Sequence, residues 1–207
     1  LLGRPVRVIN IRAERRPPGL KAQHITAIKA VAAISRALVD GLKLGSMEVV
    51  FRPQARRGGE FFFDVGTAGS ISLVLQALMP AAAFADGRVK VRIRGGTDTK
   101  MAPPIDYVRL VLLPTLKRMG YKGKLTVHRR GHYPRGGGVV DVEVEPVVKL
   151  KAIELTKFGE VERVYGISHC VRLPRHVAER QAREAERVLR EAGIENVEIE
   201  VEYYDPR

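Results

Sequence analysis

The chain has 207 residues, of which 45% are hydrophobic and 29% are charged, a balance typical of a globular protein with a sizeable core. Lysine and arginine total 36 against 23 aspartate and glutamate, giving a formal net charge of +13. This surplus favours a polyanionic partner such as nucleic acid, with a merely solubilising surface as the alternative. The single cysteine, Cys170, excludes an intrachain disulfide framework and a thiolate metal cage, and it fits a reducing cytoplasmic location. No apolar run reaches the roughly 20 residues of a membrane span.

The first part of the chain predicts strands and helices in alternation. Residues 6–11 alternate as a strand, and a turn at Pro17-Pro18-Gly19 leads into a helix. The apolar face of that helix holds Ile25, Ile28, Val31, Ala32 and Leu38. Residues 47–52 and 60–65 are rich in β-formers and predict a hairpin with a long basic connection. From Ser70 a second helix is apolar nearly all round, which predicts a buried helix ending or kinking near Pro80.

The second part repeats the pattern. Strands are predicted at residues 88–94, 124–128, 138–144, 149–155, 160–168 and 197–203, and helices at 106–119, with a kink at Pro114, and 175–192. The order βα, ββα, βα, ββ predicts an α+β fold. Its unit is a repeated βαβαββ module, a mixed sheet with helices on one face.

Three basic loops stand at predicted strand ends, at residues 12–19, 56–59 and 129–138. Each combines arginine with glycine or proline, so guanidinium groups and backbone N–H groups could meet phosphate oxygens. For any one loop an ordinary turn with solvent-facing arginine is the alternative. The three together predict a phosphate site. Gln76 is the lone amide of its helix and is interpreted either as a structural hydrogen-bond partner or as a ligand-recognition group.

The sequence resembles the RNA 3′-terminal phosphate cyclase family, in its archaeal form, over nearly its whole length. The signature is Arg94-Gly95-Gly96-Thr97-Asp98 followed by Ala102-Pro103-Pro104-Ile105-Asp106-Tyr107. Further matching motifs are Ile11-Arg12-Ala13, Gln23-His24, Gly66-Thr67-Ala68-Gly69-Ser70 and His132-Tyr133-Pro134. The resemblance implies that ATP and Mg²⁺ (or Mn²⁺) serve to close an RNA 3′-phosphate into a 2′,3′-cyclic phosphate. The implied intermediates are a histidyl-AMP and an RNA capped by AMP at its 3′-phosphate.

The resemblance also assigns site residues. It places Gln76, Pro103 and Tyr107 at the ATP pocket, and Arg12, Arg15, Gln23 and His24 around the phosphates and the RNA end. It implies a main domain at residues 1–173, lacking its first strand and helix and its C-terminal module. The start of a smaller inserted α/β domain is implied at 174–207, so the chain is expected to be truncated at both ends.

None of the five histidines of the chain matches the nucleophile of the family, which is expected beyond Arg207. The chain by itself is therefore expected to be inactive and to hold no metal. Two alternatives remain: a non-catalytic cyclase-like RNA-binding protein of ribosome assembly, and an enolpyruvyl-transferase-like enzyme. The oligomeric state is left open.

Overall fold

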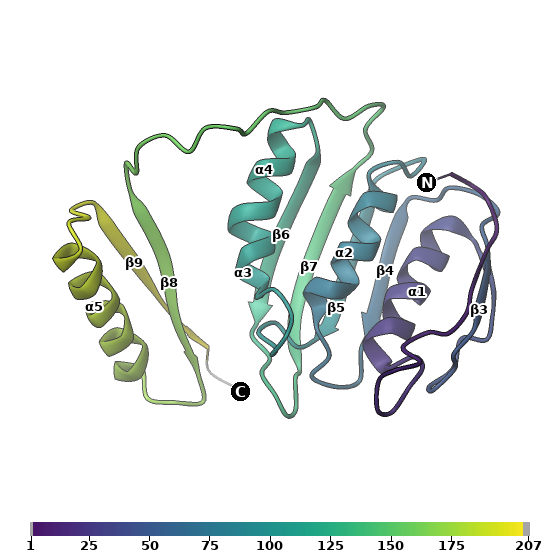
Figure 1. Ribbon diagram of the computed structural model, residues 1–207, viewed down its shortest axis with the longest axis horizontal. Helices are drawn as coiled ribbons and strands as arrows, with labels where there is room; N and C mark the ends of the chain where they lie inside the picture. The colour runs from purple at the N-terminus through teal and green to yellow at the C-terminus, as the bar shows by residue number, and fades with distance from the viewer. Residues whose placement is uncertain (1, 205–207) are drawn as a thin grey trace. The chain divides into compact units, whose positions relative to one another are not determined.

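The computed structural model describes residues 2–204 and confirms the α+β class (Figure 1). By its internal contacts the chain divides into two compact units, residues 1–153 and 154–207. The inserted domain that the resemblance begins at residue 174 stays a prediction, and its residues 205–207 lie outside the described part. Each unit is described by itself.

A complete βαβαββ module forms the centre of the first unit. It runs through β4 (Gly59–Asp64), α2 (Ile71–Ala82), β5 (Val89–Gly95), a helical segment, β6 (Lys122–Arg129) and β7 (Gly138–Glu145). The strand order is β4-β5-β7-β6, with β4 and β5 parallel and the other two pairs antiparallel. The helices cover one face of this sheet (Figure 1), so apolar residues alternate with charged ones along β5 and β7.

The preceding elements repeat the later part of that module. They are β1 (Val6–Val8), α1 (Ala22–Ser35), β2 (Leu38–Asp40) and β3 (Val49–Arg52), in the strand order β1-β3-β2 with both pairs antiparallel. β5, β6 and β7 have the same order and the same directions. Helix α1 packs beside α2, and its buried Ala30 and Ile34 belong to the apolar core that α2 and the larger sheet share. The topology thus supports the repeat that the sequence predicts only weakly.

Three predictions about strands are wrong in the part of the chain up to residue 155. The segments predicted as one hairpin, β3 and β4, belong to different sheets, because β3 pairs with β1 and β2 while β4 pairs with β5. The short strand β2 was expected to belong to the end of a helix, which stops instead at Ser35. Residues 149–155, predicted as a strand, have no regular structure.

The helical segment between β5 and β6 is broken in the way Pro114 predicts. It consists of α3 (Ile105–Tyr107), a π-helical turn (Val108–Leu112) and α4 (Leu113–Arg118). The Leu113 N–H donates to the Val108 carbonyl, five residues back. Proline has no N–H with which to continue the hydrogen bonds of an α-helix. The π-helical turn next to Pro114 is where the regular hydrogen-bond pattern is interrupted.

The second unit is a βαβ arrangement of β8 (Val164–Val171), α5 (His176–Glu191) and β9 (Val197–Tyr204). The two strands are parallel, and α5 packs on both. Ala178 and Ala182 lie on the buried face of this helix, while arginine and glutamate at helical spacing form ion pairs on its exposed side. Across the described residues, no helix has the length and apolar character needed to cross a membrane.

Candidate functional site

A cavity of about 620 Å³ lies beyond the carboxyl ends of the parallel strands β4 and β5. Segments far apart in the sequence line it: the start of α1, the loop and first turn of α2, the loop after β5, and the loop between β6 and β7. The lining residues are Gln23, Thr67, Ala68, Gly69, Leu73, Thr99, Lys100, Met101, Ala102, Tyr133 and Pro134. In open α/β sheets this edge is where ligands commonly bind.

The loops around the cavity approach one another backbone to backbone. The Gly96 N–H donates to the Gly69 carbonyl at 2.8 Å, and a Cβ on Gly96 would stand 2.3 Å from the Ala68 carbonyl oxygen. Gly136, with φ of +66°, leaves only 2.6 Å between a Cβ and the Thr67 carbonyl oxygen. Neither position has room for a side chain. The glycines of the signature are therefore explained by close packing of the loops.

A buried ionic cluster holds the same loops from behind. Arg130 has no exposed side-chain surface, and its Nη1 lies 2.7 Å from Asp106 Oδ2 and 3.5 Å from Asp98 Oδ2. Asp106 also pairs with Arg109 at 2.8 Å. The Thr97 hydroxyl donates to Asp98 at 2.7 Å and accepts from the Gly131 N–H at 3.0 Å. Thr97, Asp98 and Asp106 of the signature thus tie the loop after β5 to α3 and to the β6–β7 loop.

Gln23 is the one predicted site residue that lines the cavity. Its Oε1 accepts a hydrogen bond of 3.0 Å from the Ser70 N–H, just before α2. Because an N–H must donate to an oxygen, this bond assigns Oε1 and Nε2 of the amide. The Nε2 group keeps two N–H donors with no partner among the residues that the structure describes. The Ser70 hydroxyl in turn accepts from the Leu73 N–H and caps α2. Gln23 therefore joins α1 to the positive end of α2.

Its neighbours Arg12 and His24 organise the loop before α1. Arg12 Nη1 donates to the carbonyls of Pro17 at 3.1 Å and Gly19 at 2.8 Å. His24 Nδ1 accepts from the Lys21 N–H at 3.0 Å and thereby caps α1. Burial, and then the charges of Arg12 and Lys21, lower the pKa of His24. The ring is neutral at pH 7, so it can offer Nε2–H as a donor but no full positive charge.

The other predicted residues do not line the cavity. Gln76 is exposed, one helical turn beyond the lining residue Leu73. Because α2 keeps one face open to solvent, the prediction of a helix buried nearly all round is wrong, and the Gln76 amide meets solvent on that face. Pro103 is exposed and directly follows the lining residue Ala102, while Tyr107 is half-exposed in α3. Arg15 is exposed in the loop before α1.

The three basic loops do not all converge. The loops at 12–19 and 129–138 lie at the cavity end of the sheets, because each adjoins residues that line it. The loop at 56–59 precedes β4 and therefore stands at the opposite end of that strand. There the Gly58 N–H donates to Asp86, and Arg57 stacks on the ring of Phe61. The expectation that all three loops build one phosphate site is therefore wrong for the loop at 56–59.

Sequence reasoning missed several residues of the lining. Thr67 and Tyr133 stand inside motifs that carry the family resemblance, but no role was assigned to them. Lys100 brings an ammonium group to the lining, and its sequence context gave no signal. Arg130 looked like an ordinary turn arginine because its two acidic partners precede it by 32 and 24 residues.

The lining offers hydroxyl, amide and ammonium groups, and no carboxylate among the described residues. The nearby Asp98 and Asp106 carboxylates are held by Arg130. Protein sites for Mg²⁺ commonly use one or two carboxylates in addition to substrate phosphates. The lining of this cavity does not fit a Mg²⁺ site of this kind, and Mg²⁺ stays a prediction from the resemblance.

Comparison with known proteins gives a consistent result. A family model described as RNA 3′-terminal phosphate cyclase matches residues 1–197. Several relatives carry that same name, among them proteins from three organisms. The one from Ignicoccus hospitalis is 55% identical over 203 residues, covering 98% of this chain and 58% of the relative. The one from Hyperthermus butylicus is 56% identical over 209 residues, covering 100% and 58%. The one from Methanopyrus kandleri is 56% identical over 205 residues, covering 99% and 58%. The chain thus spans less than two thirds of the length of these relatives.

Proposed function

Because the chain belongs to the RNA 3′-terminal phosphate cyclase family, we propose that the protein containing it converts an RNA 3′-terminal phosphate into a 2′,3′-cyclic phosphodiester at the expense of ATP. The observation that supports this most is the cavity at the carboxyl ends of β4 and β5. Donor groups from both repeated modules meet there, as the binding of two phosphorylated substrates requires.

The groups of the cavity suit anionic oxygens. The Gln23 amide can donate through Nε2, Lys100 supplies a positive charge, and the amino end of α2 adds the partial positive charge of a helix terminus. Helix α2 is 12 residues long, enough for this dipole to act on a bound phosphate. In this proposal Arg12 and Arg15 contact the RNA end, and Gln76, Pro103 and Tyr107 contact the nucleotide along the rim.

The proposed chemistry activates the RNA phosphate before the ring closes. A histidine nitrogen attacks the α-phosphorus of ATP and releases pyrophosphate. An oxygen of the RNA 3′-phosphate then takes AMP from the histidine, which gives a phosphoanhydride. The neighbouring 2′-hydroxyl attacks the RNA phosphorus, loses its proton and expels AMP. Activation is needed because a phosphate monoester has no good leaving group, whereas its anhydride with AMP has one.

This proposal places the nucleophilic histidine outside the chain. Within it, the His24 Nδ1 is occupied as a helix cap, and His128 pairs with Asp141 on the open face of the sheet. His132 lies beside the cavity, 3.8 Å from Asp98. A direct test incubates the full-length protein with radiolabelled ATP and Mg²⁺, followed by mapping of the labelled peptide. We expect an acid-labile, alkali-stable adduct on a histidine beyond residue 207, and a label on His132 would contradict that placement.

A second assay follows the RNA. Full-length protein with ATP should convert a 3′-phosphate RNA to the cyclic product and leave a 3′-hydroxyl RNA unchanged. Gln76→Ala should slow adduct formation without changing stability, because its side chain is exposed. RNA binding without any adduct or cyclic product would support the non-catalytic binder instead. An RNA-independent reaction on a small acidic metabolite would support the enolpyruvyl-transferase alternative.

A further inference from the structure

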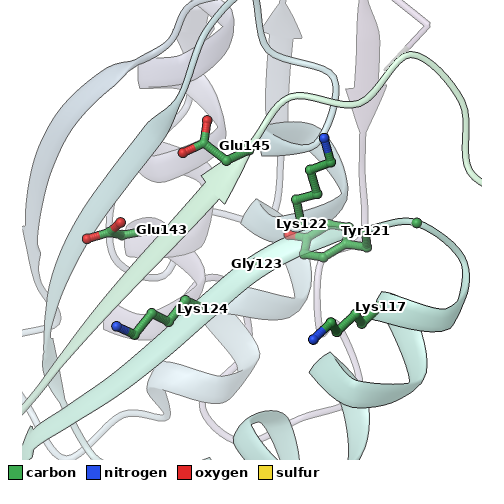
Figure 2. A pocket seen from close by; sticks show the side chains of 8 residues that line it. Lys117, Tyr121, Lys122, Gly123, Lys124, Glu143 and Glu145 are labelled. Atoms are coloured by element: carbon green, nitrogen blue, oxygen red, sulfur yellow. The ribbon is translucent and has the colours of Figure 1, made fainter.

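A second hollow, of about 490 Å³, lies at the end of the sheet opposite the candidate site. Residues of the last turn of α4, of the turn that follows it, and of β6 and β7 line it. They are Lys117, Gly120, Tyr121, Lys122, Gly123, Lys124, Glu143 and Glu145. Figure 2 shows the Tyr121 ring beside Gly123, with the three lysines around them. The Tyr121 hydroxyl donates to the Met79 carbonyl, which anchors this wall in the core.

Both carboxylates of the hollow already pair with one arginine. Glu143 and Glu145 stand directly across from Lys124 and Lys122 in the strand register. Both carboxylates, however, form ion pairs with Arg88, the residue before β5, and the Arg88 Nε lies 2.9 Å from Glu145. The three lysines have no carboxylate within ion-pair distance among the described residues. The three lysines and Arg88 carry four positive charges against the two carboxylates, so an excess of two positive charges remains at the hollow.

Simpler explanations account for single lysines only. Lys117 is in the last turn of α4, where a cation is favoured by the helix dipole. Lys122 and Lys124 are on an edge strand, where lysine discourages pairing with other chains. Neither reason accounts for further positive charge at this end of the unit. The basic loop at residues 56–59, which precedes β4, lies at the same end. So does Lys151, whose N–H donates to the Met119 carbonyl.

The lysines also do not converge. In Figure 2 the ammonium group of Lys122 points away from those of Lys117 and Lys124, and the three groups stand apart from one another. Groups that close on a single phosphate would converge on it, as a chelating site requires. Separate point charges with no planar fork fit a ligand whose charges are spread along its length. A nucleic-acid backbone has that arrangement, with one charge per nucleotide.

We propose that this hollow binds the sugar-phosphate backbone of the RNA whose 3′ end occupies the cavity, at a distance from that end. The inference rests on the proposed function for the identity of the ligand. Strand β6 joins the two regions, and its 8 residues span roughly 25 Å at about 3.4 Å per residue. A stacked RNA strand, at about 3.4 Å per nucleotide, needs about seven nucleotides from its end to reach the lysines.

The test compares RNA lengths on the full-length protein. The variant K117Q/K122Q/K124Q removes the three charges, and K29Q/K157Q/R183Q removes three exposed charges elsewhere. Binding of RNAs of about four and about 20 nucleotides is measured by fluorescence anisotropy against salt concentration. For the longer RNA we expect the hollow variant to lower the slope of log affinity against log salt by about 2, since each single-strand contact contributes about 0.7. We expect no change for the shorter RNA or for the control variant.

Each outcome bears on one proposal only. Equal weakening of both RNA lengths, no weakening of the longer one, or equal weakening by the control variant overturns the backbone site. Each RNA is also used with a 3′-phosphate and with a 3′-hydroxyl end. The hollow variant should affect both ends alike, because the lysines lie far from the terminus. A wild-type protein indifferent to the 3′-phosphate would count against the proposed function and leave the length dependence intact. Unchanged urea unfolding of both variants checks that the fold is preserved.

Discussion

Removal of the Arg130 guanidinium tests how the loops around the cavity are held together. Its side chain is 0% exposed, with Asp106 Oδ2 at 2.7 Å and Asp98 Oδ2 at 3.5 Å from Nη1. Arg130→Met retains much of the volume but leaves two largely buried carboxylates without the cation between them. Loss of one partner of a buried ion pair costs about 3–5 kcal/mol. Because Arg109 still pairs with Asp106, we expect a loss near 3 kcal/mol in the free energy of unfolding.

A matched control comes from the open face of the same sheet. Arg92 binds Asp141 through two hydrogen bonds of 2.7 Å each, but its side chain is 55% exposed. Arg92→Met should therefore cost at most about 1 kcal/mol, the usual limit for a solvent-exposed pair. The two substitutions are chemically identical and differ in burial. Their difference isolates the effect of the buried environment.

Urea unfolding at neutral pH, with an unchanged dependence on denaturant, gives both values. The double variant Arg130→Met with Asp98→Asn removes a carboxylate that has lost its contact with Arg130, so it should be at least about 1 kcal/mol more stable than Arg130→Met alone. If Arg130→Met costs no more than Arg92→Met, or if the double variant recovers nothing, the ionic cluster does not hold the loops.

Three further substitutions probe the cavity and the open sheet face. Gln23→Glu keeps an oxygen for the Ser70 N–H but loses the amide donors, so we expect unchanged unfolding and about tenfold weaker ATP binding by calorimetry. Gly136→Ala places a Cβ 2.6 Å from a carbonyl oxygen at φ of +66°, so urea unfolding should show a loss of more than about 2 kcal/mol. Hydrogen bonding, first from Arg92, lowers the pKa of Asp141. That stabilisation is present above the unfolded pKa of about 3.9 and is lost as pH falls through the folded value. The stability difference between wild type and Asp141→Asn should therefore shrink below about pH 4 in thermal unfolding.

For each of these three substitutions, one result would contradict the expectation. ATP binding unaffected by Gln23→Glu would remove the amide from the site. Gly137→Ala is the control for its neighbour, because it has φ of +78° but no heavy atom within 4 Å of a Cβ. An equal loss in both glycine variants would mean that backbone conformation, and not the close contact, sets the cost. A stability difference that stays constant down to pH 3 would exclude ionisation of Asp141 as its source.

The sequence predicted the elements of the fold better than their pairing. Helices α1 and α5 and strands β5 and β7 have periodic apolar faces that are visible without any partner. The segments of β3 and β4 also look like strands in the sequence. The alternation of apolar and polar residues, however, does not predict which strand pairs with which. A hairpin was therefore as consistent with the pattern as the two sheets that form. Strand β2 has three residues, too few for a period to be recognised.

The candidate site was predicted through the family resemblance more than through the residues themselves. Gln23 carries no local signal, since its contact with Ser70 joins positions 47 residues apart. Gln76 drew attention as a polar residue in an apolar helix, although that helix has an exposed side. The ionic partners of Arg130 and the close approach of Gly96 to Ala68 depend on long-range packing. Such contacts become visible only once the loops are placed in space.

The walls of the cavity are formed largely by main chain pressed against main chain, as the Gly96 and Gly136 contacts show. Peptide groups are the same whatever side chains accompany them, so the shape of such a wall tolerates many exchanges at its non-glycine positions. Adding or deleting one residue in any of these loops would shift every contact at once. Among homologous proteins, the spacing between the glycines should therefore vary less than the residues between them.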